Sequence, residues 1–174
     1  MKKQNYIVRN AKPEEFKRVD QLMVAVYSRL EGFPKTYEQP KYFEMLSNIG
    51  EQTKKPDTEL LVAISDIGEI CGGVVYFSDM KQYGSGGIAT HENNASGFRL
   101  LAVDSNTRGQ GIGKLLSMTC IDKAKKSGNT QLIIHSTKAM QIAWKMYEKL
   151  GFIRSEDLDF IQGELPVFGF RLKI

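Results

Sequence analysis

The sequence predicts a mixed α/β fold in a single domain spanning residues 1–174. Segments with the apolar, β-branched composition of strands alternate with segments whose apolar residues recur at helical spacing. Taken in order, these runs give β-α-α-β-β-β-α-β-α-β-β. A length of 174 residues suits one domain, and no internal repeat, low-complexity tract or linker divides the chain.

The first part of the chain contains the elements up to the second hairpin strand. We expect a strand over residues 5–11, a helix from Pro13 to about Leu30, a shorter helix around residues 42–49, and an antiparallel hairpin of strands 59–65 and 69–79. The glycine-rich stretch 81–97 shows no periodicity. It is therefore expected to be a mobile loop.

The second part of the chain alternates strands and helices. We expect a strand at 98–103, a helix at 112–126, a strand at 131–137, a helix at 138–152 ended by Gly151, a short strand within 152–158 and a final strand at 167–174. The strand–helix–strand unit formed by residues 98–137 should place its two strands parallel to each other.

Charge and composition exclude several classes of partner. Lys and Arg total 24 and Asp and Glu total 20, and a net charge of +4 is too small a bias to indicate a nucleic-acid binder. No apolar run approaches the roughly 20 residues of a membrane span, and no apolar core of a secretion signal follows the basic start. Cys71 and Cys120 form no CxxC pair and suit buried thiols in a reducing compartment. We therefore expect a cytoplasmic protein.

The segment "AVDSNTRGQGIGKLL" carries the strongest functional signal. Gly109, Gly111 and Gly113 stand at alternate positions between a strand and the start of a helix. The first turn of a helix has N–H groups without intrahelical partners, and the helix dipole makes that end positive. Glycines let an oxyanion approach these groups, and Arg108 and Lys114 flank the turn with positive charge. The pattern predicts an anion site.

Close packing and the common nucleotide-binding loops account for these glycines less well. A tight strand-to-helix turn with a close packing contact would explain one or two glycines, but not three between Arg and Lys. A Walker A loop requires Ser or Thr after GK, and Leu115 stands there. A dinucleotide fold requires GxGxxG. Neither Gly109-x-Gly111 nor Gly111-x-Gly113 is followed by a glycine three residues later.

The pattern that fits is R-x-x-G-x-G, supplied by Arg108, Gly111 and Gly113. With it, "FRLLAVDSNTRGQGIGKLLSMTCIDKAKKSG" and "HSTKAMQIAWKMYEKLGFIR" resemble the two characteristic segments of the GCN5-related N-acetyltransferase (GNAT) family. The resemblance covers most of the chain. It implies a mostly antiparallel sheet with a central, splayed parallel strand pair and helices on both faces.

The resemblance also implies acetyl-coenzyme A (acetyl-CoA) as cosubstrate. The backbone of the turn would hold its pyrophosphate, and the pantetheine arm would lie beside the preceding strand. The implied cosubstrate-binding residues are Leu101, Ala102, Val103, Arg108, Gly109, Gln110, Gly111, Ile112, Gly113 and Lys114. No metal is implied, and the two histidines with no cysteine near them give no metal pattern either.

Tyr147 matches the family's tyrosine, which the resemblance implies to be the general acid for the leaving thiolate. From its residue type alone, it better suits the rim of an apolar helix face. Many relatives carry Glu near the start of the strand that here has Phe98 and Arg99, so no general base is evident. Three nearby residues could replace it, although each suits an ordinary surface position: Asp79, His91 and Glu92.

Two functions follow from the resemblance. The first is direct transfer of an acetyl group to a primary amine on a small molecule or peptide. The second is an inactive CoA-binding sensor or regulatory module, favoured by the missing acidic residue. Relatives often dimerise, so a homodimer is possible, whereas the sequence does not reveal the acceptor.

Overall fold

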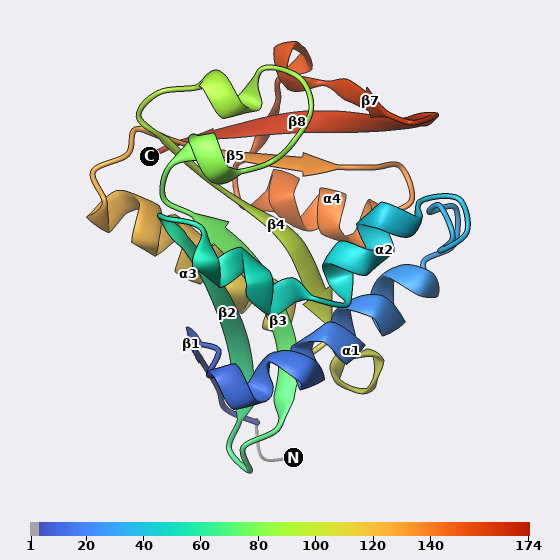
Figure 1. Ribbon diagram of the computed structural model, residues 1–174. Helices are drawn as coiled ribbons and strands as arrows, with labels where there is room; N and C mark the ends of the chain where they lie inside the picture. The colour runs from blue at the N-terminus through green and yellow to red at the C-terminus, as the bar shows by residue number, and fades with distance from the viewer. Residues whose placement is uncertain (1–3) are drawn as a thin grey trace.

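The computed structural model describes residues 4–174 and contains a strongly twisted sheet (Figure 1). In order across the sheet, the strands are β1 (Tyr6–Asn10), β2 (Thr58–Ser65), β3 (Ile70–Phe77), β4 (Ala95–Val103), β5 (Gln131–Ser136), β8 (Leu165–Lys173) and β6 (Ile153–Arg154), and β7 (Phe160–Gln162) pairs with β8. Strands β4 and β5 pair in parallel, and the other described pairs are antiparallel. The expected mixed α/β topology is confirmed.

Helices cover both faces of this sheet, as expected. Within residues 4–174 the α-helices are α1 (Phe16–Ser28), α2 (Pro40–Leu46), α3 (Ile112–Lys126) and α4 (Gln141–Lys149). Because strand side chains alternate between faces, Leu60 and Val62 of β2 pack in the core under α1 and α2, whereas Leu61 and Ala63 pack in the core under α3 and α4. The sheet therefore separates two hydrophobic cores.

Two predicted helices start later than the sequence pattern indicates. Pro13–Glu15 form a 3-10 turn before α1 begins, and Glu15 accepts a hydrogen bond from the backbone N–H of Lys12 (2.8 Å). Likewise, Thr137–Met140 form a turn closed by the Met140 N–H on the Thr137 carbonyl (3.0 Å), so α4 begins only at Gln141. Gly151, with φ +100°, follows the end of α4 as predicted.

Strand β4 starts three residues earlier than predicted, so the expected loop 81–97 is wrong at its end. Residues 95–97 pair with 131–133 of β5. In the sequence, Gly97 is typical of a loop, but in the structure its lack of a side chain permits close packing of β4 against β5. A Cβ on it would lie 2.7 Å from the Ile133 carbonyl oxygen and 2.9 Å from the Tyr83 ring. Tyr83 and Ala89 are fully buried, which anchors the preceding segment to the core. Strand β7 was not predicted.

Beyond Gly97 the parallel pair separates. The ladder between β4 and β5 ends at Gly97 and Ile133, although β4 continues to Val103. Arg99 lies opposite Val75 and Ala102 opposite Gly73, so two residues of β4 face one residue of β3 and form a bulge. Leu100, in this bulge, has φ +60°. The expected splayed pair is confirmed, and one edge of β4 is left without a strand partner.

Other features agree with the composition. Cys71 and Cys120 are both buried free thiols, and burial raises the pKa of each. None of the helices described in residues 4–174 is long and apolar enough to cross a membrane.

We predict that Gly97→Ala lowers the free energy of unfolding by about 1–3 kcal/mol, because the new methyl group would collide with the backbone of β5. Gly113→Ala is the matched control. A Cβ there has its nearest contact at 3.6 Å, and alanine favours the helix. Urea unfolding of both variants measures the difference. Equal stability of Gly97→Ala and wild type would contradict close packing of β4 on β5.

Candidate functional site

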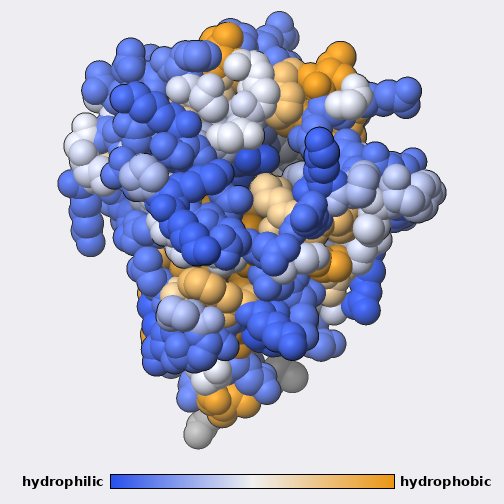
Figure 2. Space-filling view, viewed as in Figure 1, coloured by the Kyte–Doolittle hydropathy of each residue, from blue (hydrophilic) through white to orange (hydrophobic). Residues whose placement is uncertain are grey.

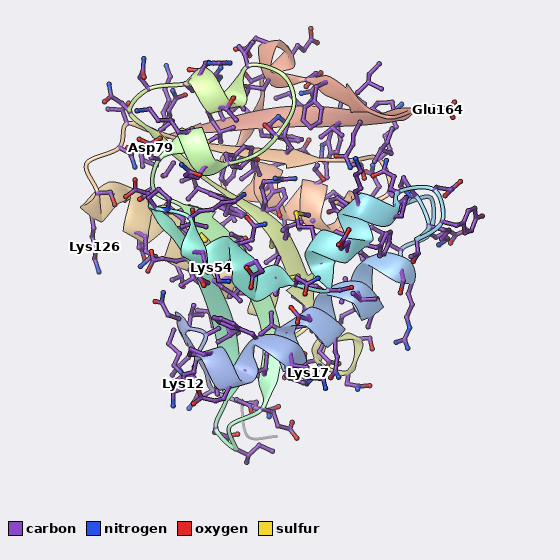
Figure 3. All side chains as sticks on the ribbon, viewed as in Figure 1. Lys12, Lys17, Lys54, Asp79, Lys126 and Glu164 are labelled. Carbon is purple, nitrogen blue, oxygen red and sulfur yellow. The ribbon has the colours of Figure 1, made fainter. Side chains whose placement is uncertain are left out.

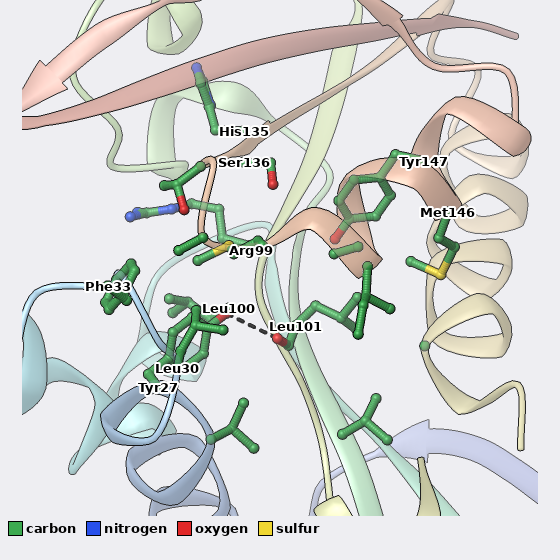
Figure 4. Close-up of a pocket in the computed structure, with 18 of the residues that line it drawn as sticks. Tyr27, Leu30, Phe33, Arg99, Leu100, Leu101, His135, Ser136, Met146 and Tyr147 are labelled. Carbon is green, nitrogen blue, oxygen red and sulfur yellow. Dashed lines mark hydrogen bonds between the residues drawn. The ribbon is translucent and has the colours of Figure 1, made fainter. Parts of the chain in front are cut away.

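The separation of β4 from β5 opens a cavity of about 620 Å³. Its lining comes from α1, α2 and the loop between them, from Ser85 and β4, and from the start of α3, the end of β5, α4 and the β7–β8 hairpin. Figure 2 shows orange and pale atoms in a hollow over β4, surrounded by blue hydrophilic side chains. Figure 4 shows the cavity in detail, with side chains from α1, β4, β5 and α4 converging on it.

The glycine turn forms one end of this cavity. Gly109 and Gly111 have φ values of +80° and +81°, a conformation that glycine adopts without strain. A Cβ at either position would meet no atom within 4 Å. Close packing against protein therefore does not explain these two glycines. Their backbone shape does, and it leaves the approach to the start of α3 open.

The start of α3 offers unpaired backbone donors. The first α-helical hydrogen bond runs from the Leu115 N–H to the Gly111 carbonyl (2.9 Å). In residues 4–174, the N–H groups of Ile112, Gly113 and Lys114 have no backbone or side-chain acceptor. Gly111, at the N-cap, has no side chain to provide one. Arg108 and Lys114 line the cavity beside these donors. The arrangement is suited to binding a phosphate group.

The remaining sequence-predicted residues in this region divide into two groups. Leu101 and Val103 line the cavity, whereas Ala102 is buried in the core under α1. Gln110 does not line the cavity, because its side chain bonds the Tyr6 hydroxyl on the outer side of the turn. The Leu101 carbonyl oxygen accepts a hydrogen bond from the Tyr27 hydroxyl (3.0 Å; Figure 4).

Tyr147 stands on α4 with its ring buried and its hydroxyl directed into the cavity (Figure 4). The ring packs edge-on against Phe98 and Phe152, at centroid distances of 5.9 and 5.8 Å. The hydroxyl has no hydrogen-bond partner within residues 4–174. Burial raises the pKa of Tyr147, so the phenol keeps its proton at neutral pH.

Two residues of the cavity lining have side-chain hydroxyl groups without a partner in the described residues. Ser136 and Thr137, at the end of β5, are buried, and neither side-chain oxygen has a hydrogen bond within the described residues. A buried hydroxyl without a partner is costly, so a polar ligand or water that reached these groups would stabilise them. Neither residue stands out in the sequence, because the burial of both depends on where β5 meets α4.

The other end of the cavity contains Arg99 and His135. Arg99 donates through Nη1 to the Tyr83 carbonyl (2.8 Å), and its guanidinium lies over the Tyr83 ring at 5.5 Å from the centroid. His135 bonds the Tyr83 hydroxyl through Nδ1 and the Leu158 carbonyl through Nε2, each at 2.9 Å. A carbonyl only accepts, so Nε2 carries the proton and Nδ1 accepts from the phenol.

Burial lowers the pKa of His135 to about 4. The ring is therefore neutral at pH 7 with both nitrogens engaged, which leaves it without a free lone pair for a general base. His135 is thus a buried residue whose two ring nitrogens are both hydrogen-bonded.

None of the three base candidates lines the cavity. Asp79 lies at the outer edge of the molecule, where its carboxylate accepts from the Lys81 N–H (2.8 Å; Figure 3). Glu92 pairs with Arg171 (2.9 Å), and His91 is an exposed residue of the 3-10 turn 89–91. The described residues that line the cavity include no Asp or Glu. Within residues 4–174, no group of three or more His, Cys, Asp or Glu side chains could hold a metal ion.

Comparison with known proteins identifies the family. The model of the Acetyltransferase (GNAT) family matches residues 23–152, about three quarters of the chain. The chain belongs to this family of acetyltransferases.

Solved structures of the GNAT fold align along almost the whole chain. The PaiA N-acetyltransferase of Thermoplasma acidophilum, in complex with coenzyme A, is 15% identical with a TM-score of 0.74, covering 98% of this chain and 99% of that one. A GNAT acetyltransferase of Staphylococcus aureus Mu50 is 16% identical with a TM-score of 0.73, covering 97% and 99%. YncA of Salmonella typhimurium, solved with acetyl-CoA, is 13% identical with a TM-score of 0.64, covering 97% and 94%.

Two curated relatives match a shorter segment. N-acetylaspartate synthetase of Xenopus tropicalis is 36% identical over 61 residues, and that of Danio rerio is 35% identical over 63 residues. These matches cover 35% and 36% of this chain. The chain spans about a fifth of the length of these relatives, 22% in each case.

The depressed pKa of His135 predicts a pH dependence of stability. Between pH 6.5 and 4 the unfolded chain protonates this residue and the folded protein does not, so stability falls as pH falls. The slope from this one group is about 1.4 kcal/mol per pH unit. We expect the stability difference between wild type and His135→Gln to shrink as pH drops through this window. The matched control is His91→Gln, and urea midpoints at several pH values give the measurement. A difference that stays constant would contradict a neutral, buried His135.

Proposed function

We propose that the protein transfers the acetyl group of acetyl-CoA to a primary amine on a small molecule or peptide, by direct attack of the amine. The observation that carries this proposal is the open glycine corner at the start of α3, which leads into the cavity between β4 and β5. The fold neighbours solved with coenzyme A or acetyl-CoA support it. The two buried free thiols fit a cytoplasmic location.

The residues of the glycine corner fit a diphosphate. The backbone N–H groups from Arg108 to Lys114, through Gly109, Gln110, Gly111, Ile112 and Gly113, would bind its oxygens, with the Arg108 and Lys114 side chains adding positive charge. Gln110 would contribute only its backbone, because its side chain is bound to Tyr6. The orphan hydroxyls of Ser136 and Thr137 are consistent with a polar ligand in this cavity.

The unpaired edge of β4 would bind the pantetheine arm. Leu101, Ala102 and Val103 would offer main-chain groups to it, as a neighbouring strand would. The Leu101 carbonyl is already held by Tyr27, so that phenol fixes the shape of the bulge. A main-chain N–H on this edge would stabilise charge that builds on the thioester oxygen during transfer.

The chemistry requires two proton movements. The amine nitrogen forms a bond to the acetyl carbon, the C–S bond breaks, and Tyr147 gives its phenolic proton to the departing thiolate sulfur. The amine must lose a proton as well. Because no carboxylate is found among the described residues that line the cavity, we assign that proton to solvent water rather than to a protein base. The acetyl product named by the N-acetylaspartate synthetases is also N-linked, which supports a nitrogen acceptor.

The phosphate assignment predicts a charge-dependent loss of affinity. Asn and Asp both tolerate a positive φ and have nearly the same size, so Gly111→Asp and Gly111→Asn differ mainly in charge. We expect Gly111→Asp to weaken coenzyme A binding about 10- to 100-fold more than Gly111→Asn, through repulsion of the diphosphate. Calorimetric titration with coenzyme A measures both. Equal affinities would contradict a diphosphate beside Gly111.

The general-acid role predicts an effect on turnover alone. Tyr147→Phe should lower kcat by about 10²–10⁴-fold while coenzyme A affinity stays near wild type. Tyr37→Phe is the matched control, since Tyr37 is 83% exposed and outside the cavity. Thiol release with a panel of primary amines reports turnover. A fully active Tyr147→Phe would remove the tyrosine from the mechanism, and no turnover of any amine by the wild type would favour a CoA-binding module.

A further inference from the structure

The cavity has a one-sided charge distribution. Its charged lining residues are Arg99, Arg108 and Lys114, and no acidic residue accompanies them in the described lining. The proposed function accounts for Arg108 and Lys114, which flank the glycine corner. Arg99 lies four residues before Val103, at the other end of β4's exposed edge, and the proposed function leaves it unexplained.

Arg99 is partly buried and has no anionic partner within residues 4–174. Its guanidinium bonds the Tyr83 carbonyl through Nη1, and none of the ion pairs in this part of the chain involves it. The groups that face it are neutral at pH 7. Burial lowers the pKa of His135 to about 4 and raises the pKa of Tyr42 to about 12, and it also raises the pKa of Tyr27 and Tyr83. A partly buried cation without a counterion favours the binding of an anion.

Several contacts hold Arg99 in place. The Tyr83 side chain is fully buried, and its hydroxyl bonds His135, which is fixed in turn by the Leu158 carbonyl. The guanidinium therefore rests on a rigid group and extends into the cavity (Figure 4). The Nη1 contact occupies one of the five N–H donors, and the planar fork of the others suits a carboxylate.

The surroundings of Arg99 are mostly apolar and aromatic, and the uncharged polar residues Ser85 and Gln162 also line the cavity. Phe33, Tyr42, Phe160, Leu165 and Val167 line this end of the cavity, and Phe160 packs edge-on against the His135 ring with centroids 5.1 Å apart. A second charge on the ligand would find no counterion among these residues. A long polyamine would bring several ammonium groups to a cavity whose described lining has cations and no carboxylate.

From this geometry we infer that the acceptor is an amine that carries a single carboxylate and an otherwise apolar body, with Arg99 binding that carboxylate. An apolar α-amino acid is the simplest molecule of this class. The inference rests on the proposed acetyl transfer and adds the chemistry of the acceptor to it.

The test compares acceptors with and without this carboxylate. Thiol release from acetyl-CoA is measured with L-methionine, L-leucine and L-phenylalanine, each against its α-carboxamide, and with L-aspartate and spermidine. We expect wild-type kcat/KM to favour the carboxylate over its carboxamide by about 10- to 100-fold, mainly through KM, because the carboxamide loses a charge-assisted hydrogen bond. Aspartate and spermidine should be poorer acceptors than the three amino acids.

Substitution of Arg99 should remove this preference. In Arg99→Met, which keeps a long apolar stem, the ratio of carboxylate to carboxamide kcat/KM should fall about 10- to 100-fold below the wild-type ratio, and Arg99→Lys should restore part of it. Arg29→Met, an exposed arginine of the same chain outside the cavity, should keep the wild-type ratio. Because each ratio is taken within one variant, a general loss of activity does not affect it. Thermal melting and coenzyme A calorimetry accompany each variant.

Each outcome has one meaning. Equal turnover of carboxylates and carboxamides by the wild type overturns the role of Arg99 and leaves acetyl transfer standing. A wild-type preference for aspartate overturns the apolar acceptor. A loss of coenzyme A affinity in Arg99→Met with an unchanged ratio shows that Arg99 serves the cosubstrate instead. If the wild type releases no thiol with any acceptor, including spermidine and the carboxamides, the proposed function itself fails.

Discussion

The separation of β4 from β5 after Gly97 determines the rest of the site. The two strands pack so closely at Gly97 and Ile133 that only glycine fits, and they then diverge. The bulge at Leu100 turns β4 further from the regular ladder. This single divergence creates the cavity, exposes main-chain groups of β4, and places the start of α3 and the end of β5 on opposite walls. The hydrophobic cores under the helices hold the strands in that arrangement.

The sequence allowed much of the fold to be predicted, because apolar periodicity is local information. The hairpin β2–β3 and helix α3 follow their patterns closely. The start of β4 was missed for a physical reason. In the sequence, Gly97 is typical of a loop. Only the folded structure shows that the β5 backbone lies too close to Gly97 to leave room for a side chain. The three-residue strand β7 was missed because its partner β8 is what makes it a strand.

In the candidate site, too, local features could be predicted from the sequence and those that depend on the folded chain could not. The glycine corner could be predicted, since few structural roles require alternating glycines between Arg and Lys, and the structure removes close packing as one of them for Gly109 and Gly111. The cavity lining could not be predicted, because it joins residues from β4, β5, α4 and the β7–β8 hairpin that are far apart in the chain. Arg99 attracted notice in the sequence only as a departure from the family's glutamate, and its contact with Tyr83 required the folded chain.

The presence of Arg99 in place of the family's glutamate and the lack of a carboxylate base in the described lining have a common physical consequence. An ammonium group entering this cavity meets burial and the positive charge of Arg99, with no carboxylate in the described lining to offset either. Both effects favour the neutral amine, so they lower the amine's pKa and raise the fraction that can attack a thioester. A carboxylate base would do the opposite, because its charge would stabilise the ammonium form until the proton moved. On the acceptor proposed above, the carboxylate paired with Arg99 would offset much of that positive charge. Burial, together with a described lining that has no Asp or Glu, would then be the main influence that disfavours the proton on the nitrogen.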